Sequence, residues 1–290
     1  MNDREPPPLL LAPLRGVTIR CFRETFAGAV RDAGFTEAVT PFITANAGVD
    51  PVKDRELRGG PADGIRVTPQ FIGKDPAALR FCLERIRSAG WETADLNCGC
   101  PFPMVRNKGR GSGLLRTPDV LRRMLDVGCE TMGPGRFSVK ARIGVDSRDE
   151  LLGLMPILND YPLRFLVVHA RTARQMYEGE CDLEMAELVE SVAKMPVVRN
   201  GDIGLPPPEG VRGAMVGRAF IRSLASREDV AELMDRYVAA SLAELKSERP
   251  VLGRMKELLS YWAELPGWRR RWKVAKMARS LQELRVWPRL

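Results

Sequence analysis

Histidine is almost absent from this chain of 290 residues, which contains only one, His169. Cys98 and Cys100 form one close pair of potential metal ligands. No second pair of cysteines or histidines stands nearby to complete a tetrahedral zinc site, so we expect no metal. The six cysteines are scattered along the chain, which does not fit a disulfide framework and suits a reducing compartment.

Long apolar runs are also missing. No stretch approaches the roughly 18 apolar residues that a membrane-spanning helix needs. The proline-rich start, residues 5–11, is acidic and too short for a signal peptide. The apolar fraction of 44% and the charged fraction of 28% are typical of a globular protein. We expect a cytoplasmic monomer that binds no membrane and needs no obligate protein partner.

Charge is balanced through most of the sequence and unbalanced at its end. Residues 249–290 contain eleven Lys and Arg against three Asp and Glu, a surplus that equals the net charge of +8 of the whole chain. Four of the five Trp lie in the same segment, at positions 262, 268, 272 and 287. Such a segment is suited to nucleic-acid phosphates and bases. The alternative is a helical bundle with Trp in its core, and the spacing of Trp268 and Trp272 favours core positions for these two.

Short apolar runs rich in β-branched residues alternate with helical patterns as far as residue 221. Eight such runs predict an α/β fold, a (β/α)8 TIM barrel. We expect a barrel domain at residues 1–222 and an all-α, basic helical domain of about four helices at residues 223–290, ending near Pro288. The strands are expected at residues 9–14, 37–43, 66–73, 93–99, 137–144, 165–171, 196–203 and 213–221.

Helical patterns fill most of the links between these strands. Pro76 after Asp75 and Pro118 after Thr117 are typical of helix starts. The link at residues 204–212 contains three consecutive prolines, so we expect no helix between the seventh and eighth strands. A longer loop is expected at residues 45–64. The helices are expected at residues 19–33, 75–89, 117–132, 147–159 and 182–194.

Unusual polar or glycine residues stand at the ends of seven of the eight strands. Each has a possible structural explanation on its own, but the C-terminal strand ends of such a barrel form its active site. We therefore expect these residues to meet at one site. In chain order they are Arg15 and Gly16, Gln70, Asn97 and Cys100, Lys140 and Arg142, His169 and Arg171, Asn200 to Asp202, and Gly217 with Arg218.

A phosphorylated cofactor fits this arrangement. Backbone amides after the seventh and eighth strands, with Arg218, occupy the recurrent phosphate position of this barrel. Lys140 and His169 would face a ring that becomes anionic on reduction. Flavin mononucleotide (FMN) matches a single phosphate. The glycines at 109, 111 and 113 do not have the spacing of a dinucleotide-binding turn.

The sequence resembles the tRNA-dihydrouridine synthases. The matching motifs occur in the family's order over residues 9–221, and Asn97-Cys98-Gly99-Cys100-Pro101 is highly specific to it. Leu14 stands where Met is usual, and the link at Pro206 to Pro208 is shortened. The Cys98-Gly99-Cys100 form and the run from Arg171 to Tyr177 resemble the DusC-type bacterial branch. The other motifs are Ala12-Pro13-Leu14-x-Gly16, Gln70, Lys108, Gly111, Lys140-x-Arg142, His169-Ala170-Arg171, Asn200-Gly201-Asp202 and Gly217-Arg218.

The resemblance implies reduction of a specific tRNA uridine to 5,6-dihydrouridine. FMN, reduced by NADPH or NADH, would pass hydride to C6 while Cys100 protonates C5. An ordinary thiol is protonated at neutral pH and can donate a proton. Cys98 is the competing acid. Asn97, Arg171 and Tyr177 are expected to contact the substrate. The tail resembles the family's RNA-binding domain, with Arg269, Arg270, Arg271 and Lys273 expected to bind tRNA. The expected cofactor residues are Ala12, Pro13, Leu14, Gln70, Lys140, His169, Asn200, Gly201, Asp202, Gly217 and Arg218.

Two alternatives remain open from sequence. A small-molecule pyrimidine flavin oxidoreductase, of the dihydroorotate or dihydropyrimidine dehydrogenase kind, shares the barrel and the flavin, but it has no use for a basic tail. An RNA-binding chaperone with weak catalysis would fit the missing helix, but it would not need Cys100, Lys140 and His169. A flavin absorption spectrum of the purified protein separates the chaperone from the enzymes.

Overall fold

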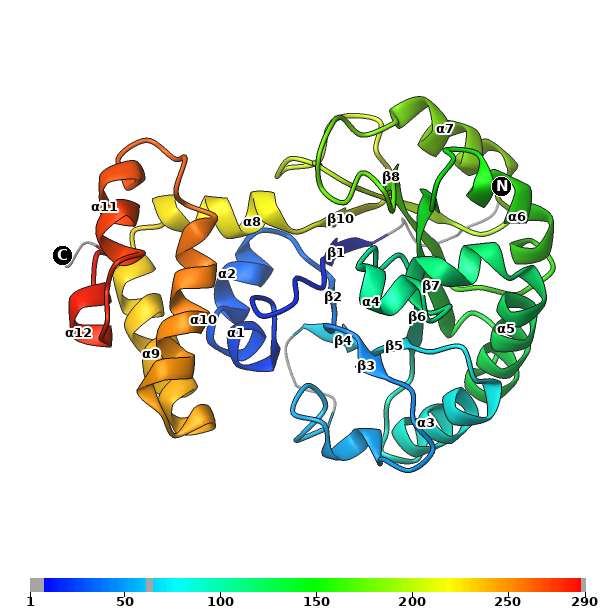
Figure 1. Ribbon diagram of the computed structural model, residues 1–290, viewed down its shortest axis with the longest axis horizontal. Helices are drawn as coiled ribbons and strands as arrows, with labels where there is room; N and C mark the ends of the chain where they lie inside the picture. Colours follow the sequence, from blue (N-terminus) through cyan, green and yellow to red (C-terminus); the bar gives the residue numbers. More distant parts are fainter. Residues whose placement is uncertain (1–7, 61–64, 288–290) are drawn as a thin grey trace.

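The sheet closes into a barrel, although it consists of ten strand segments. The structure is a computed structural model that describes residues 8–60 and 65–287. Its parallel segments follow the order β3-β5-β6-β7-β8-β9-β10-β1-β2-β4. β2 (Glu37–Val39) and β3 (Ile43–Thr44) are halves of one strand, and β4 (Arg66–Thr68) and β5 (Gln70–Ile72) are halves of the next. Because β2 pairs with β4 and β3 pairs with β5, the two ends of the sheet meet and eight strands close the barrel (Figure 1).

All eight predicted strands are present. The two breaks coincide with Pro41 and Pro69, which have no backbone N–H to donate to a neighbouring strand. The first strand ends before Pro13 for the same reason. The eighth strand is shorter than predicted because the polypeptide enters a helix at Arg218. The remaining strands are β1 (Leu9–Leu11), β6 (Ala94–Cys98), β7 (Phe137–Gly144), β8 (Leu166–Thr172), β9 (Val197–Asn200) and β10 (Ala214–Val216).

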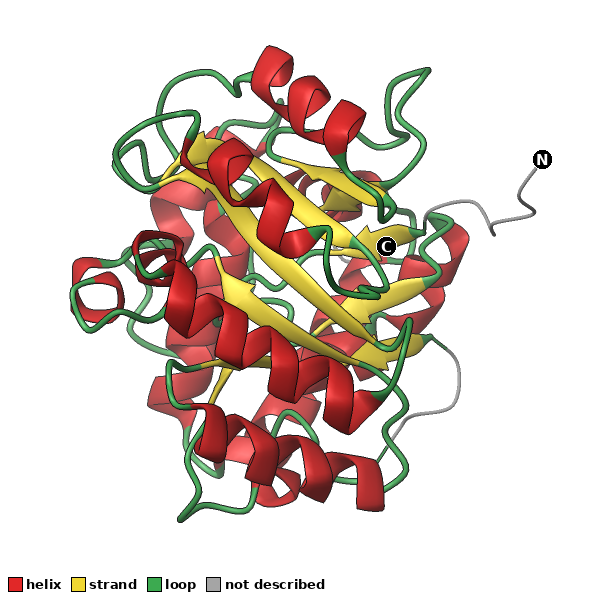
Figure 2. Cartoon of the chain, turned by 90° about the vertical axis from the view of Figure 1, so that its right-hand side faces the viewer, coloured by secondary structure: helices red, strands yellow, loops and turns green. Residues whose placement is uncertain are grey.

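Helices cover the outside of the barrel (Figure 2). Asp75 caps its helix as predicted, with its carboxylate accepting the amide of Ala77. Residues 204–212 contain no helix, also as predicted. The barrel helices are α1 (Arg20–Thr25), α2 (Ala27–Asp32), α3 (Pro76–Ser88), α4 (Pro103–Arg106), α5 (Pro118–Met132), α6 (Glu150–Leu158), α7 (Leu183–Val192) and α8 (Arg218–Ser223), and the 3-10 turns are η1 (Pro51–Lys53), η2 (Gly111–Arg116) and η3 (Leu224–Ser226).

Two apolar layers hold the barrel together. The larger layer lies between the strands and the helices α3, α5, α6 and α7. The smaller layer fills the barrel interior, which is a packed core. The interior residues are Leu10, Ala12, Val39, Phe165, Val167, Val198 and Met215.

Four further helices form the tail, as predicted: α9 (Val230–Leu245), α10 (Glu248–Ser260), α11 (Trp268–Ala275) and α12 (Leu281–Leu284). They lie against one side of the barrel (Figure 1). None of the helices that the structure describes is long and apolar enough to cross a bilayer. The proline-rich start up to Pro7 and the expected end of the tail at Pro288 lie outside the described residues.

Aromatic residues join the tail to the barrel. Phe22 stacks on Phe26 with ring centroids 4.4 Å apart, and Tyr237 of α9 meets the Phe22 ring edge-on at 5.8 Å. Phe220 of α8 packs against the same ring. Trp262 is fully buried, and its Nε1 donates to the carbonyl of Ile221 at 2.6 Å. Barrel and tail therefore share one apolar core.

Candidate active site

The two cysteines at the end of the fourth strand lie in different environments. Cys98 is the last residue of β6, and its side chain is 0% exposed in the apolar layer outside the barrel. Cys100 lies beyond the strand end and is 6% exposed. Burial raises the pKa of both thiols. The cations Arg15, Arg142 and Lys140 lie close enough to Cys100 to oppose this rise.

A tight loop holds Cys100 in place. The Asn97 Oδ1 accepts the backbone amides of Gly99 at 3.1 Å and of Cys100 at 2.9 Å. The Cys100 carbonyl accepts the Ser112 hydroxyl at 2.9 Å and the Ser112 amide at 3.2 Å. Gly111 has a φ of +57°, and a side-chain carbon there would lie 2.8 Å from the Cys100 Cβ. The glycine-rich run after Cys100 therefore serves close packing around the thiol.

Polar side chains on β5, β6 and β7 form a buried series of hydrogen bonds behind this loop. The Asn97 Nδ2 donates to the Gln70 Oε1 at 2.7 Å, and the Gln70 Nε2 donates to the Asp95 Oδ1 at 2.7 Å. The Ser138 hydroxyl donates to the second Asp95 oxygen at 2.7 Å. Burial raises the pKa of Asp95 to about 6. Sequence reasoning missed Asp95, although it shares a strand face with Asn97.

Lys140 and His169 lie side by side on neighbouring strands. The Lys140 Nζ donates to the Asn200 Oδ1 at 2.9 Å, and the Asn200 Nδ2 donates to the Met215 carbonyl at 2.8 Å. Burial lowers the pKa of Lys140 to about 8. Burial, with nearby cations such as Lys140, holds the pKa of His169 well below its ordinary value, so the ring is neutral. Its Nε2 is buried and has no hydrogen-bond partner among the described residues.

Glycines allow close packing at the neighbouring strand ends. At Gly201 (φ +108°), a side-chain carbon would lie 2.9 Å from the His169 ring. At Gly217 it would lie 3.1 Å from the Ala12 Cβ. Both glycines therefore let neighbouring residues pack closely at the ends of the seventh and eighth strands, where the barrel's recurrent phosphate position lies.

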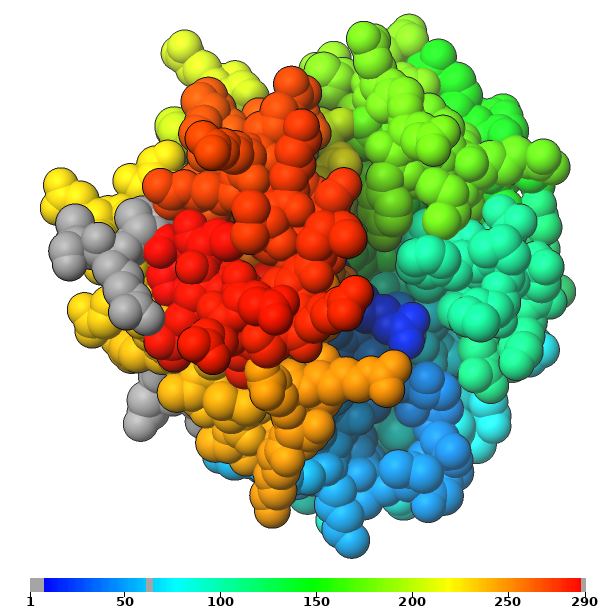
Figure 3. Space-filling view, turned by 60° about the vertical axis from the view of Figure 1, so that its left-hand side comes forward, coloured from blue at the N-terminus to red at the C-terminus, as the bar shows by residue number. Residues whose placement is uncertain are grey.

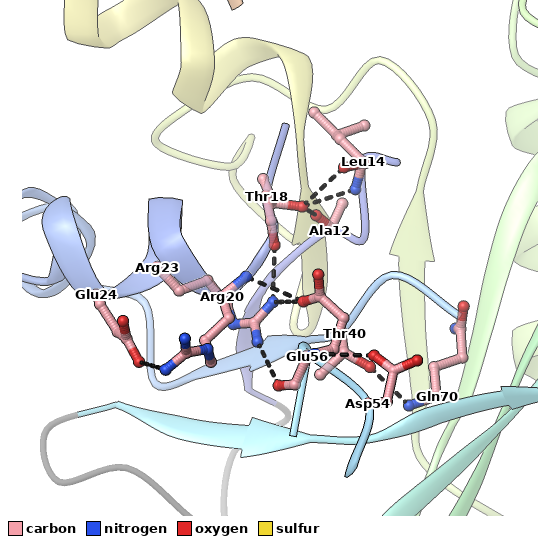
Figure 4. A network of polar contacts seen from close by, with 10 residues as sticks. All are labelled: Ala12, Leu14, Thr18, Arg20, Arg23, Glu24, Thr40, Asp54, Glu56 and Gln70. Carbon is pink, nitrogen blue, oxygen red and sulfur yellow. Dashed lines mark hydrogen bonds and ion pairs between the residues drawn. The ribbon is translucent and has the colours of Figure 1, made fainter. Parts of the chain in front are cut away.

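The segment Ala12-Pro13-Leu14 is fixed by Thr18 (Figure 4). The Thr18 hydroxyl donates to the Ala12 carbonyl at 2.8 Å and accepts the Leu14 amide at 2.7 Å. Arg23 donates to the Thr18 carbonyl at 2.8 Å and forms a buried ion pair with Glu56 at 2.9 Å. The loop after the second strand thus supports the end of the first.

Arg171, Asp202 and Arg218 form one ion-paired group, with Asp202 between the two guanidiniums. Arg171 is buried and also donates to the carbonyls of Glu178 and Gly179, at 3.2 and 3.1 Å from its Nε. It therefore holds the loop that carries Tyr177. The half-exposed Tyr177 ring lies 5.3 Å from the Arg142 guanidinium and 6.0 Å from that of Arg218.

The tail reaches the same site. The Glu257 carboxylate of α10 lies against Gly16, which has a φ of +83° and no side chain to block this approach. Burial raises the pKa of Glu257, and the Arg15 charge opposes the rise. Tyr261, directly after α10, lies near Tyr177 and Arg218. Figure 3 shows a groove between the tail and the barrel, with residues near the N-terminus at its bottom. Nothing in the sequence placed Glu257 or Tyr261 at the site.

The predicted RNA-binding residues lie on or beside α11. Arg270 and Lys273 are exposed, and neither has an ion-pair partner in the described part of the chain. Arg269 pairs with Glu264 at 3.3 Å. Arg271 lies over the Trp268 ring at 5.2 Å. Trp268 is buried as expected, and Trp272 is partly buried.

Metal ligation finds no support in the described residues, which contain no group of three or more His, Cys, Asp or Glu side chains able to hold an ion. The donors at the strand ends are instead cations, amides and a neutral imidazole. Such a set fits an anionic, planar organic group with a phosphate. The unpartnered His169 Nε2 and the Lys140 ammonium meet part of that requirement.

Solved structures show the same fold. Morphinone reductase in complex with tetrahydroNAD superposes with a TM-score of 0.53 at 12% identity, covering 74% of this chain and 84% of that one. An old yellow enzyme homologue from Zymomonas mobilis gives a TM-score of 0.51 at 12% identity, covering 74% of this chain and 85% of that one. These likenesses concern the fold alone.

Sequence relatives share the barrel. The tRNA-dihydrouridine synthase B of Vibrio vulnificus is 29% identical over 221 residues, 72% of this chain and 66% of the relative. The tRNA-dihydrouridine synthase B of Pseudomonas aeruginosa is 31% identical over 223 residues, which are 73% of this chain and 65% of the relative. A probable tRNA-dihydrouridine synthase of Helicobacter pylori is 31% identical over 224 residues, which are 74% of this chain and 67% of the relative. The chain thus spans slightly less than two thirds of the first of these relatives.

The family profile for dihydrouridine synthase (Dus) matches residues 10–223. This range extends from the first strand through α8 and includes every strand end described above. The chain belongs to the dihydrouridine synthase family.

Proposed function

We propose that this protein reduces a specific uridine of tRNA to 5,6-dihydrouridine. The observation that carries the proposal is the Cys100 thiol, held by a dedicated loop at the same barrel end as Lys140 and His169. The relatives named above as tRNA-dihydrouridine synthases support the substrate class.

The strand ends would hold FMN, with NADPH or NADH as its reductant. Once bound and reduced, FMN supplies the hydride for C6 of the uracil. The Lys140 ammonium and the unpartnered His169 Nε2 would face its ring, while Gln70 offers amide groups from β5. Ala12 to Leu14 would border the ring, and the backbone at Gly201 and Gly217 would receive the phosphate. Arg218, which pairs with Asp202, would contribute its charge there.

Cys100 would act as the general acid that protonates C5. Because burial raises its thiol pKa, the proton stays on sulfur at neutral pH until the substrate takes it. Solvent then reprotonates the thiolate. Cys98 is enclosed in the apolar layer, which supports the choice of Cys100. Asn97, Arg171 and Tyr177 are the proposed substrate residues, with Arg171 acting mainly by holding the loop of Tyr177.

The tail would bind the tRNA so that the target base enters the groove between tail and barrel. A base must leave its stack to reach a site of this depth. Arg270 and Lys273 are the strongest phosphate-binding candidates because their charges are not neutralised by a neighbouring carboxylate. Arg269 and Arg271 complete the proposed surface. A boundary between barrel and tail at residue 222, a monomeric state without an obligate protein partner, and a cytoplasmic location belong to the same proposal.

Membership of the DusC-type branch also stays a proposal. It rests on the Cys98-Gly99-Cys100 sequence and on the run from Arg171 to Tyr177, whereas the relatives named above carry the type B name. The position of the modified uridine would decide it.

Mapping dihydrouridine in tRNA from a strain that lacks this gene tests the function. We expect one position to lose the modification and to regain it with the wild-type gene but not with Cys100→Ala. A complete dihydrouridine pattern in the deletion strain, combined with reduction of a free pyrimidine by the purified flavoprotein, would favour the small-molecule alternative.

A further inference from the structure

The buried series of hydrogen-bonded side chains behind Cys100 can run in only one donor-to-acceptor direction. The backbone amides of Gly99 and Cys100 can only donate, so the Asn97 side chain must offer them its oxygen. Its nitrogen then faces Gln70, which must accept through Oε1 and donate through Nε2. This series of hydrogen bonds therefore needs, at its far end, a group that accepts a hydrogen bond from Gln70. Asp95 is that group.

An ionised carboxylate is the one common side chain that accepts at both oxygens and donates at neither. The Asp95 Oδ1 accepts from Gln70 at 2.7 Å and its Oδ2 accepts from Ser138 at 2.7 Å. An amide at position 95 could donate to Gln70 instead. It would then permit a reversed chain in which Asn97 presents its nitrogen to two N–H donors.

We propose that Asp95 is a positioning residue for Cys100, because its carboxylate fixes the orientation of the Gln70 and Asn97 amides and so holds the Cys100 loop. Asp95 itself is fully buried, and its two carboxylate oxygens accept from Gln70 and Ser138. The functional part of this inference rests on the proposed role of Cys100, whereas the structural part does not.

The single variant Asp95→Asn tests the proposal in the flavin-loaded, full-length protein. We expect Cys100 to react with iodoacetamide about tenfold faster than in the wild type, the factor that loss of roughly one hydrogen bond gives. Peptide-resolved mass spectrometry measures each thiol separately. Cys82, which is buried in the apolar layer, serves as the internal control and should stay protected. We also expect slower single-turnover dihydrouridine formation with unchanged tRNA affinity.

The double variant Asp95→Asn/Asn97→Asp separates orientation from simple packing. Here the carboxylate moves to position 97, where it accepts from the Gly99 and Cys100 amides and from the Gln70 nitrogen. The Gln70 oxygen then accepts from the new amide at position 95, whose own oxygen accepts from Ser138. Every hydrogen bond is satisfied with the polarity reversed, so protection of Cys100 should return to the wild-type level.

Ser138→Ala is the matched control, because it removes the other hydrogen bond of Asp95 and leaves the bond to Gln70 in place. We expect Cys100 protection in this variant to stay within about twofold of the wild type. Unchanged Cys100 reactivity in Asp95→Asn, or no recovery in a folded double variant, would overturn the proposal. If Asp95→Asn does not fold, the double variant alone decides.

The proposed function fails in a different way. Dihydrouridine formation that survives in Cys100→Ala would remove Cys100 as the acid. The alkylation results for Asp95 would still stand, because they report the position of the loop and not the reaction.

Discussion

Cys98 and Cys100 stand two residues apart and form a matched pair for testing the acid. We expect Cys100→Ala to keep flavin and tRNA binding but to lose dihydrouridine formation by a factor on the order of 10² to 10⁴, the usual contribution of a positioned acid. Cys98→Ala should lose far less, because that thiol is enclosed in the apolar layer. Single-turnover assays with pre-reduced enzyme measure both. The reverse ranking of the two variants would contradict the assignment.

His169 gives the flavin-free protein a distinct pH dependence. An unfolded chain protonates its histidine near pH 6.5, whereas burial keeps the pKa of the folded imidazole well below that value. Below pH 6.5 the unfolded state therefore binds more protons, and the free energy of unfolding falls as the pH falls. One such group contributes a slope of about 1.4 kcal/mol per pH unit.

His169→Gln removes this slope because glutamine does not titrate. Urea unfolding at pH 7.5 and at pH 5.5 should show that the wild type loses about 1.4 kcal/mol more stability than the variant over this interval. Both measurements need protein free of flavin, since a bound group would protect the folded state. Parallel pH profiles of the two proteins would mean that the folded imidazole titrates normally.

The sequence predicted which residues gather at the site because parallel strands bring their C-terminal ends to one edge. Lys140, His169 and Asn200 meet for this reason. Contacts between distant segments were not predictable. The pairing of Arg218 with Asp202 and the approach of Glu257 to Gly16 depend on loop and tail positions that no local pattern encodes.

At the scale of elements, glycines of η2 and α6 provide a further test. Gly111→Ala should lower the free energy of unfolding by about 1–3 kcal/mol and should displace Cys100, because the backbone there has a positive φ and the Cys100 Cβ leaves no room. Gly153→Ala is the control, since nothing lies within 4 Å of its position on the helix α6. That change should raise stability by about 0.5–1 kcal/mol.

Chemical unfolding and the alkylation rate of Cys100 measure the effects of Gly111→Ala. A variant as stable and as protected as the wild type would show that the η2 segment shifts freely and does not clamp the thiol. Gly153→Ala should leave the alkylation rate unchanged.

Periodicity was sufficient to predict all eight strands and the main barrel helices, because each buries an apolar face. Proline explains the remaining differences in the second and third strands. The short helix α4 was not predicted, since four residues are too few to show a helical repeat. The absence of a helix at residues 204–212 was predictable because three prolines exclude a helix interior.

At the scale of the whole molecule, the unpaired cations of α11 test tRNA binding. We expect Arg270→Gln/Lys273→Gln to weaken tRNA binding and to flatten its dependence on salt, by about one unit of slope for each tRNA phosphate that the variant no longer binds. Flavin content should not change. Filter binding over a series of salt concentrations measures the affinity and the slope.

Arg80→Gln/Arg122→Gln is the control, because it removes the same charge from the outer wall of the barrel, where both guanidiniums pair with carboxylates. Its salt slope should match that of the wild type. Equal slopes in all three proteins would remove α11 from the RNA interface.

The aromatic core shared by barrel and tail limits how such proteins can be recombined. Phe22, Phe26 and Phe220 belong to the barrel side, where the Tyr237 ring of the tail packs edge-on against Phe22 and Phe26. Trp262 of the tail belongs to the same core and donates to the carbonyl of Ile221. A tail transplanted from another family member would carry the wrong partners for these rings. Grafting a tail from another member therefore requires transplanting the facing surface of α1, α2 and α8 with it.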